Sequence, residues 1–155
     1  MTTKRTHRRP GSPYEPPLDL SPDTHDARIA EAEIAWIVSK RGAAMRSRDA
    51  DWLAARYLPG APVVGPTPPV TRIADPRLDA VRIGQWFDLL QGRIRWSVRI
   101  EGLDLAGDAA VCRTTERVSY RALCRERVRA TLDTMIGLRR VGDRWLIDWE
   151  QAVDA

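Results

Sequence analysis

Histidine is almost missing from this sequence. The two histidines, His7 and His25, both precede the first apolar position of the periodic stripe, Ile29. We therefore expect no Ser-His-Asp or Cys-His catalytic site in the folded body, and no histidine-based zinc site. Glycine-rich phosphate loops and dinucleotide-binding fingerprints are missing as well. The sequence therefore predicts neither a metal site nor a bound cofactor.

Long apolar runs and a disulfide framework are also lacking. No run approaches about 18 apolar residues, so we expect no transmembrane helix, and no apolar run follows the basic N-terminus as in a secretory signal. Two cysteines are too few for a disulfide scaffold, and a reducing cytoplasm is the expected location. With 155 residues, 43% of them hydrophobic, the chain fits one domain with a core.

The net charge of +4 is concentrated at the N-terminus, where residues 1–9 hold four basic side chains and no acid. The rest of the chain is therefore neutral. Together with its prolines, this composition predicts a disordered tail over residues 1–22 and a folded domain over residues 23–155. We interpret the tail as a solvated extension and do not expect nucleic acid as a partner. A basic arm for an acidic partner is the alternative.

Helix signals occur in the first part of the chain. Periodicity and capping residues predict a helix over about residues 24–47, a short helix capped by Asp49, and a third capped by Asp75 and ended by Gly92. A rigid, proline-rich loop is expected over residues 65–76. The core-facing stripe expected for the first helix is Ile29, Ala32, Trp36 and Ala43, joined by Ile37 and Ala44.

Strand periodicity follows Gly92. Long strands are predicted over residues 93–105, 109–121, 127–140 and 144–153, after a short strand over residues 61–64. Gly102 marks an expected bulge. The order α-α-β-α-β-β-β-β predicts an α+β domain in which helices cover one face of a curved, mainly antiparallel sheet.

Three stretches of the chain, residues 48–61, 103–111 and 138–147, resemble the nuclear transport factor 2-like superfamily. That group includes ketosteroid isomerases and SnoaL-like polyketide cyclases. The resemblance implies a cone-shaped fold whose open end leads to an apolar pocket for a hydrophobic small molecule. It also implies a homodimer formed sheet to sheet.

The residues that ketosteroid isomerases use are not retained. By spacing, the position of their tyrosine falls near Arg41, that of the general base near Gly65, and that of the protonated aspartic acid near Ile136. None keeps the chemical type that the mechanism needs. Steroid-type isomerisation by that route is therefore not expected.

Three carboxylates remain as candidate general acids or bases: Asp133, Asp148 and Glu150. Strict alternation puts Asp148 and Glu150 on one face of the last strand and Trp149 on the other. If the two carboxylates face the cone, an apolar wall would raise the pKa of each toward neutrality. Solvation or pairing with arginines is the alternative.

Candidate ligand contacts come from one hairpin and from the aromatic residues. Arg113, Thr115 and Arg117 share a strand face, and Asp133 lies on the neighbouring strand. In a pocket an arginine here would bind a carboxylate or enolate oxygen, and on an exposed sheet it would form a surface ion pair. The aromatic residues expected to line the cone or to fill its core are Trp36, Tyr57, Trp86 and Trp149.

The leading functional hypothesis is a small-molecule-binding, SnoaL-like domain. It would bind a hydrophobic substrate, with or without a proton-transfer reaction of the cyclase, isomerase or dehydratase type. The alternative is a non-catalytic dimeric module that contacts protein or nucleic-acid partners through the sheet or the basic tail. Whether the chain is an enzyme stays open, because one scaffold of this kind hosts many functions.

Overall fold

The computed structural model describes residues 22–65 and 75–155 of the chain. Its elements are α1 (Pro22–Ser47), α2 (Ala50–Arg56), β1 (Val63–Val64), α3 (Pro76–Asp88), β2 (Leu90–Ala106), β3 (Ala109–Ala122), β4 (Arg127–Val141) and β5 (Arg144–Asp154). The predicted order and the α+β class are confirmed. The tail and most of the proline-rich loop lie outside the described residues, so the domain boundary stays a prediction.

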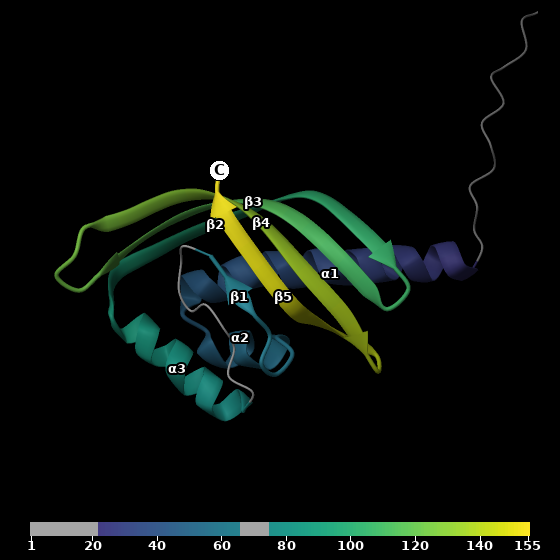
Figure 1. The fold of residues 1–155 in the computed structure, drawn as a ribbon, viewed down its shortest axis with the longest axis horizontal. Coiled ribbons are helices and arrows are strands. Elements are labelled where there is room, and N and C mark those ends of the chain that lie inside the picture. The colour runs from purple at the N-terminus through teal and green to yellow at the C-terminus, as the bar shows by residue number, and fades with distance from the viewer. Residues whose placement is uncertain (1–21, 66–74) are drawn as a thin grey trace, which may run out of the picture.

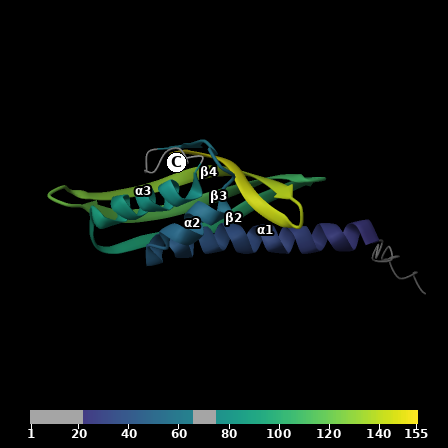
Figure 2. The same ribbon diagram turned by 90° about the horizontal axis from the view of Figure 1, so that it is seen from below.

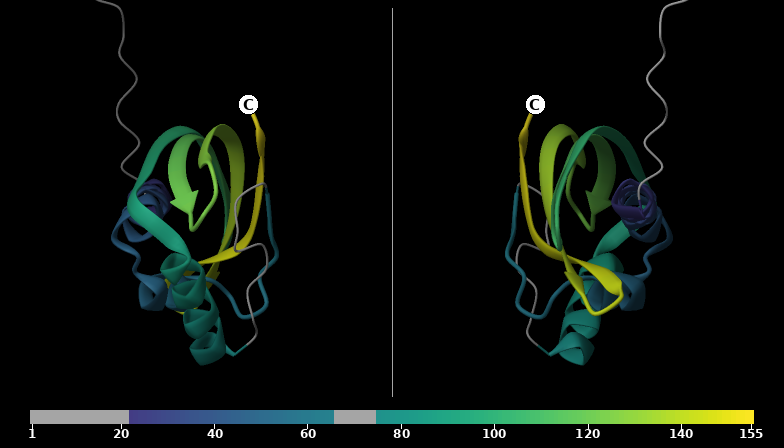
Figure 3. Two further views of the ribbon diagram at one scale, coloured as in Figure 1. Left: turned by 90° about the vertical axis from the view of Figure 1, so that its left-hand side faces the viewer. Right: turned by 90° about the vertical axis from the view of Figure 1, so that its right-hand side faces the viewer.

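The strands form one sheet in the order β1-β5-β4-β3-β2. β1 runs parallel to β5, and the remaining neighbours are antiparallel. Helix α1 lies along this sheet, whereas α2 and α3 pack together at one side (Figures 1 and 2). Seen end on, the sheet bends into an arch (Figure 3). The arch gives the sheet an inner face toward the helices and an outer face away from them.

The helix starts follow from local capping, as predicted. The side chain of Asp49 accepts a hydrogen bond from the backbone N–H of Trp52 at 3.0 Å, and Asp75 accepts one from Arg77 at 2.9 Å, next to Pro76 at the first helical position. The end of α3 was predicted wrongly. The helix ends at Asp88, and Gly92, expected to terminate it, lies within β2.

The core-facing side of α1 differs from the predicted stripe. Of the predicted residues Ile37 and Ala44 are buried, whereas Ile29 and Trp36 are 55% and 54% exposed. The buried face also contains Ala30, Ile34, Val38, Arg41 and Met45. Alanines on several sides of the helix blur the apolar period, and a charged residue stands in the middle of the buried face. The predicted stripe is therefore rotated around the helix, by about one residue, from the side that faces the core.

A β-bulge in β5 breaks the predicted alternation. Leu138 of β4 pairs with Ile147 and Gly137 pairs with Trp149, so Asp148 is an extra residue in the ladder. As a result Glu150 is buried, as Trp145 and Ile147 are. The prediction that Asp148 and Glu150 share a face is therefore wrong. The bulge predicted at Gly102 is confirmed, because the β2–β3 register shifts between Ile100 and Gly102.

Gly137 gives a first prediction. A Cβ there would collide with the indole ring of Trp149, so we expect Gly137→Ala to lower the free energy of unfolding by about 1–3 kcal/mol. Gly84 is the matched control, because its nearest neighbour to an added Cβ is the Cβ of Ala50 at 4.0 Å and the site is helical. Gly84→Ala is expected to raise stability by about 0.5–1 kcal/mol. Urea titrations in which the free energy of unfolding changes in the same direction for both variants would contradict this packing.

Candidate functional site

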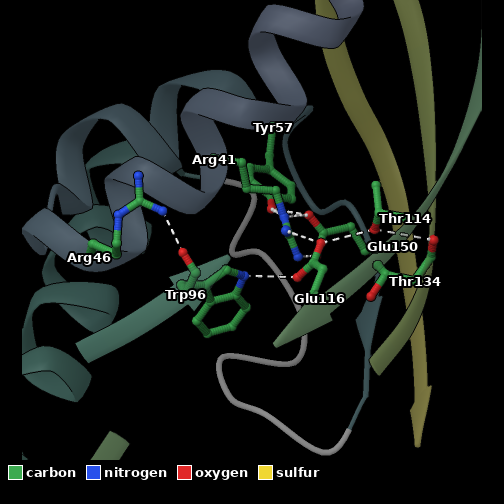
Figure 4. Close-up of polar contacts among 8 residues, drawn as sticks. All are labelled: Arg41, Arg46, Tyr57, Trp96, Thr114, Glu116, Thr134 and Glu150. Carbon is green, nitrogen blue, oxygen red and sulfur yellow. Dashed lines mark hydrogen bonds and ion pairs between the residues drawn. The ribbon is translucent and has the colours of Figure 1, made fainter. Parts of the chain in front are cut away.

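A cluster of charged and polar side chains lies inside the arch, among otherwise apolar residues. Arg41 is 6% exposed, Glu150 5% and Glu116 0%, and Tyr57 beside them is 4% exposed. They come from α1, β5, β3 and the C-terminal cap of α2. We call these four residues the arginine–glutamate cluster (Figure 4).

Arg41 bridges the two glutamates. Its Nε and Nη2 donate to Oε1 and Oε2 of Glu150 at 2.5 and 3.0 Å, and its Nη1 donates to Oε1 of Glu116 at 2.7 Å. Its Nε also lies 3.2 Å from the hydroxyl of Tyr57, which itself donates to Oε1 of Glu150. The fork on Glu150 is the geometry in which an arginine binds a carboxylate most strongly.

Glu116 has two further partners on the sheet. The indole Nε1 of Trp96, from β2, donates to its Oε2 at 2.8 Å, and the hydroxyl of Thr114 lies 3.1 Å from its Oε1. The guanidinium of Arg41 also lies over the ring of Trp96, 5.8 Å from the ring centroid. The cluster is thus held rigidly by donors from two strands and one helix.

The electrostatic balance of the cluster is uneven. Burial lowers the pKa of Arg41, but the carboxylates of Glu116 and Glu150 outweigh burial and hold this pKa well above its usual value. Arg41 is therefore always charged. When both glutamates are ionised, one cation faces two anions, and the buried cluster carries one surplus negative charge. A proton would neutralise this surplus, and a ligand that donates hydrogen bonds would stabilise it.

A polar atom without a partner lies near the cluster. The hydroxyl Oγ1 of Thr134, on β4, is buried and makes no hydrogen bond within the described residues. Its strand neighbour Thr114 hydrogen-bonds to Glu116 and lies 3.5 Å from the carbonyl oxygen of Thr134. An unsatisfied buried hydroxyl costs free energy, and a bound ligand or water would remove that cost.

The structure brings two of the predicted site residues together, Tyr57 and Glu150. The sequence neighbours of Glu150, Asp148 and Trp149, lie outside the arginine–glutamate cluster. Asp148 faces outward and pairs with Arg139 at 3.0 Å. Trp149 lies across Gly137, where the lack of a side chain leaves room for the indole ring.

The predicted hairpin residues lie on the outer face of the sheet. Arg113, Thr115 and Asp133 line a hollow of about 310 Å³ there, together with the apolar side chains of Met135 and Val153. Arg117 lines neighbouring hollows on the same face. These side chains lie on an exposed sheet, because they alternate with the inward-facing Cys112, Thr114 and Glu116 of β3. Arg113 forms a surface ion pair there, with Asp104 at 3.8 Å, whereas Arg117 pairs with no carboxylate of the described residues.

The remaining aromatic candidates differ in position. Trp36, expected to line or fill the cone, is instead half exposed on α1, with the guanidinium of Arg56 5.7 Å from its ring centroid. Trp86 is half-buried on α3 and packs edge-on against Tyr120 of β3, with ring centroids 5.6 Å apart. Of these two tryptophans, only Trp86 lies against the inner face of the sheet.

The predicted site does not contain Arg41, Glu116, Trp96 or Thr114. For Glu116 a signal existed, since it is the acidic residue in the alternating set Cys112, Thr114, Glu116, Val118 and Tyr120, the more apolar face of its strand. A carboxylate on an otherwise apolar strand face indicates a buried, paired acid. For Arg41 the shifted helix stripe hid the corresponding signal.

The described part of the chain contains no group of three or more His, Cys, Asp or Glu side chains placed to hold a metal ion. None of its helices is long and apolar enough to cross a membrane.

Comparison with known proteins shows what the chain is similar to. No family model and no curated protein sequence matches it. Among solved structures, a protein of the nuclear transport factor 2-like group from Novosphingobium aromaticivorans superimposes with a TM-score of 0.65, at 18% identity over 90% of this chain and 92% of that one. A protein of unknown function from Pseudomonas putida gives a TM-score of 0.65, at 18% identity over 81% of this chain and 87% of the other.

A third solved structure is described as a putative dehydratase of the nuclear transport factor 2-like family, from Streptomyces avermitilis. Its TM-score is 0.60, at 17% identity over 86% of this chain and 99% of that one. The chain therefore has the nuclear transport factor 2-like fold, and the resemblance seen in the sequence is confirmed at the level of the fold. Identities this low carry no activity from one protein to another.

The cluster predicts a strong effect of removing its cation. Arg41→Met leaves two buried carboxylates without compensation, and we expect a loss of about 3–5 kcal/mol in the free energy of unfolding. The triple variant R41M/E116Q/E150Q should recover most of this loss. Arg139→Met, at a surface pair, is the control and should cost no more than about 1 kcal/mol. Equal urea midpoints for Arg41→Met and Arg139→Met would show that the ion network does not exist in solution.

The two thiols are expected to react very differently. Burial raises the pKa of the Cys112 thiol to about 11, with a further rise from the charge of Glu116, whereas Cys124 is exposed between β3 and β4. At pH 8 the native protein should therefore release one equivalent of thionitrobenzoate quickly from Ellman's reagent and the second only after unfolding. In the Cys124→Ser variant the fast phase should vanish. Two fast equivalents in the native wild-type protein would contradict the burial of Cys112.

Proposed function

Starting from the nuclear transport factor 2-like fold, we propose that this protein binds a hydrophobic small molecule inside the cone and moves a proton to or from it. The arginine–glutamate cluster carries out the proton transfer. The observation that carries the proposal is the pair of buried carboxylates, Glu116 and Glu150, bridged by the single guanidinium of Arg41.

A purely structural role explains this cluster poorly. Replacing a buried ion network by apolar side chains of similar volume is often neutral or stabilising, so stability alone does not favour one. Buried titratable groups arranged around a specific charge partner are characteristic of sites that handle protons.

The contacts suggest a role for each side chain. Glu150 accepts hydrogen bonds from both Arg41 and Tyr57, so a proton taken from a ligand by this carboxylate has a path through the Tyr57 hydroxyl. Arg41 would stabilise negative charge that develops on a ligand oxygen. Glu116, linked to the same guanidinium and to the indole of Trp96, would hold Arg41 in position.

The reaction class follows from the arginine–glutamate cluster. Dehydration, cyclisation and isomerisation each require one group that removes a proton and one that returns a proton to oxygen or carbon. The similar structure from Streptomyces avermitilis is described as a putative dehydratase, which agrees with this class. The unpartnered Thr134 hydroxyl adds a hydrogen-bonding position for a polar group of the ligand.

A second candidate function is suggested by the outer face of the sheet. Met135 and Val153, 43% and 52% exposed, border a hollow there and would be covered by a homodimer partner. A similar structure from Xanthomonas campestris, with a TM-score of 0.55 at 15% identity, is described as a putative association domain of a calcium/calmodulin-dependent protein kinase. Pairing through this face is compatible with catalysis inside the cone.

The test measures binding and proton transfer separately. A panel of polycyclic and terpenoid ketones and alcohols is screened by thermal shift, where a ligand at a hundred times its Kd adds about 2.7 kcal/mol of stability. Each ligand that binds is then incubated with the protein in D2O, and loss of its C–H signals is followed by NMR. Glu150→Gln and Tyr57→Phe should bind the ligand, and Glu150→Gln should exchange its protons at least about a hundredfold more slowly, the low end for loss of a general base. Tyr57→Phe should also slow the exchange.

The control is Asp148→Asn, which changes a carboxylate two residues away on the outer side of the same strand. It should bind and exchange as the wild type does. The proposal fails if no ligand in the panel raises the midpoint, or if exchange is equally fast in Glu150→Gln and in Asp148→Asn.

A further inference from the structure

The outer face of the sheet carries a regular array of arginines near the β3–β4 end. Arg95 of β2 pairs in register with Ser119 of β3, which pairs with Arg129 of β4. One step along the strands the order is reversed, because Arg117 of β3 lies between two hydroxyl-bearing residues, Ser97 and Thr131. Arginines and hydroxyls therefore alternate in both directions on this surface.

The spacing of the array follows from sheet geometry. Residues two apart on a strand lie about 6.7 Å apart, and neighbouring strands about 4.8 Å apart. Arg127 precedes Arg129 by two residues on β4 and donates from Nη1 to the hydroxyl of Ser119 at 3.0 Å. Four guanidinium groups, on Arg95, Arg117, Arg127 and Arg129, thus stand around one serine. We call these four residues the arginine face.

These cations have no acidic partner within the described residues. No ion pair there joins any residue of the arginine face to a carboxylate, and Arg95, Arg117 and Arg129 have no hydrogen bond from their side chains. Four other exposed arginines of the sheet are each paired with a carboxylate, namely Arg99, Arg113, Arg139 and Arg140. An array of uncompensated, adjacent cations is destabilised by mutual repulsion, which a bound anion would relieve.

The surface is also hollowed at this place. The four arginines line a hollow of about 540 Å³ together with Ser119 and Thr131. A second hollow of about 510 Å³ adjoins it and shares Arg95 and Arg117, with Arg46 and Arg93 at its edge. These volumes match a small molecule, since ligand sites typically enclose about 300–1,000 Å³.

A second copy of the chain does not fit the arginine face, so the homodimer proposed over Met135 and Val153 would have to leave the arginine face uncovered. Placed directly opposite, it would bring like charges together. Turned end for end, it would present the other half of the outer face, where Arg99 and Arg113 balance Glu101 and Asp133. Neither arrangement supplies net negative charge. Nucleic acid single strands are disfavoured as well, because no aromatic side chain of the described residues lines the first hollow, and Trp96 at the second is buried, with 4% exposed.

We infer that the arginine face is a binding site for a small molecule carrying two or more linked phosphate groups. Guanidinium groups with interspersed hydroxyls are the donor set that binds phosphate oxygens, and several guanidinium groups within one hollow select for linked phosphates over a single one. The site lies on the opposite face of the sheet from the arginine–glutamate cluster. It is independent of the function proposed above.

The experiment uses inorganic tripolyphosphate as the probe, with the full chain, by isothermal titration calorimetry at low salt. We expect one site per chain that binds tripolyphosphate at least about tenfold more tightly than monophosphate. The variant R95Q/R117Q/R129Q should weaken this binding by at least about tenfold, because each charge-assisted hydrogen bond contributes on the order of a tenfold factor in affinity.

The matched control removes the same charge elsewhere. Arg28, Arg77 and Arg144 are exposed on α1, α3 and β5, and R28Q/R77Q/R144Q should leave binding within about threefold of the wild type. Equal losses in the two triple variants would overturn the proposal, since they would show dependence on net charge alone. So would the lack of any preference for tripolyphosphate over monophosphate. If a 20-base-pair DNA duplex binds more tightly per phosphate than tripolyphosphate does, and this binding is lost in R95Q/R117Q/R129Q only, the result would overturn the proposal and identify the ligand as nucleic acid.

Discussion

The buried guanidinium of Arg41 is the interaction on which the interior of this fold depends. It joins α1 to β5 through Glu150 and to β3 through Glu116, and the hydroxyl of Tyr57 ties in the end of α2. Charges can be buried at this depth only when they are paired and fully hydrogen-bonded, so the positions of the helix and the two strands are coupled. The same constraint leaves two acids around one base, which is the basis for the proposed proton chemistry.

Side chains along β3 point alternately to the inner and the outer face of the sheet, so neighbouring residues of this strand belong to two different sites. Thr114 and Glu116 point inward to the cluster, whereas Thr115 and Arg117 point outward from the same strand. The inner face presents carboxylates in an apolar surrounding, and the outer face presents unpaired cations to solvent. A fold of this kind can therefore carry an enclosed acid–base site and an anion-binding surface without either disturbing the other, because the sheet lies between them.

Much of the fold could be predicted because its signals are local. The capping of α2 by Asp49 and of α3 by Asp75 involves residues two or three apart, and the turns at Gly107 and Gly142 require positive φ angles that glycine adopts without strain. The site was predicted only in part. Glu150 was selected as a polar residue of the last strand, but Glu116, the deepest carboxylate, was overlooked in favour of the arginines on either side of it.

The sequence by itself determined the order of elements, the approximate bounds of β3, β4 and β5, and the alternating faces of β3, since these depend on neighbours along the chain. Only the tertiary structure decided which face points inward. The extra residue Asp148 bulges out because β4 pairs with β5 on both sides of it, and this turns Glu150 toward Arg41, 109 positions earlier in the chain. Register and charge pairing at that separation are set by packing across the sheet, which no local pattern encodes.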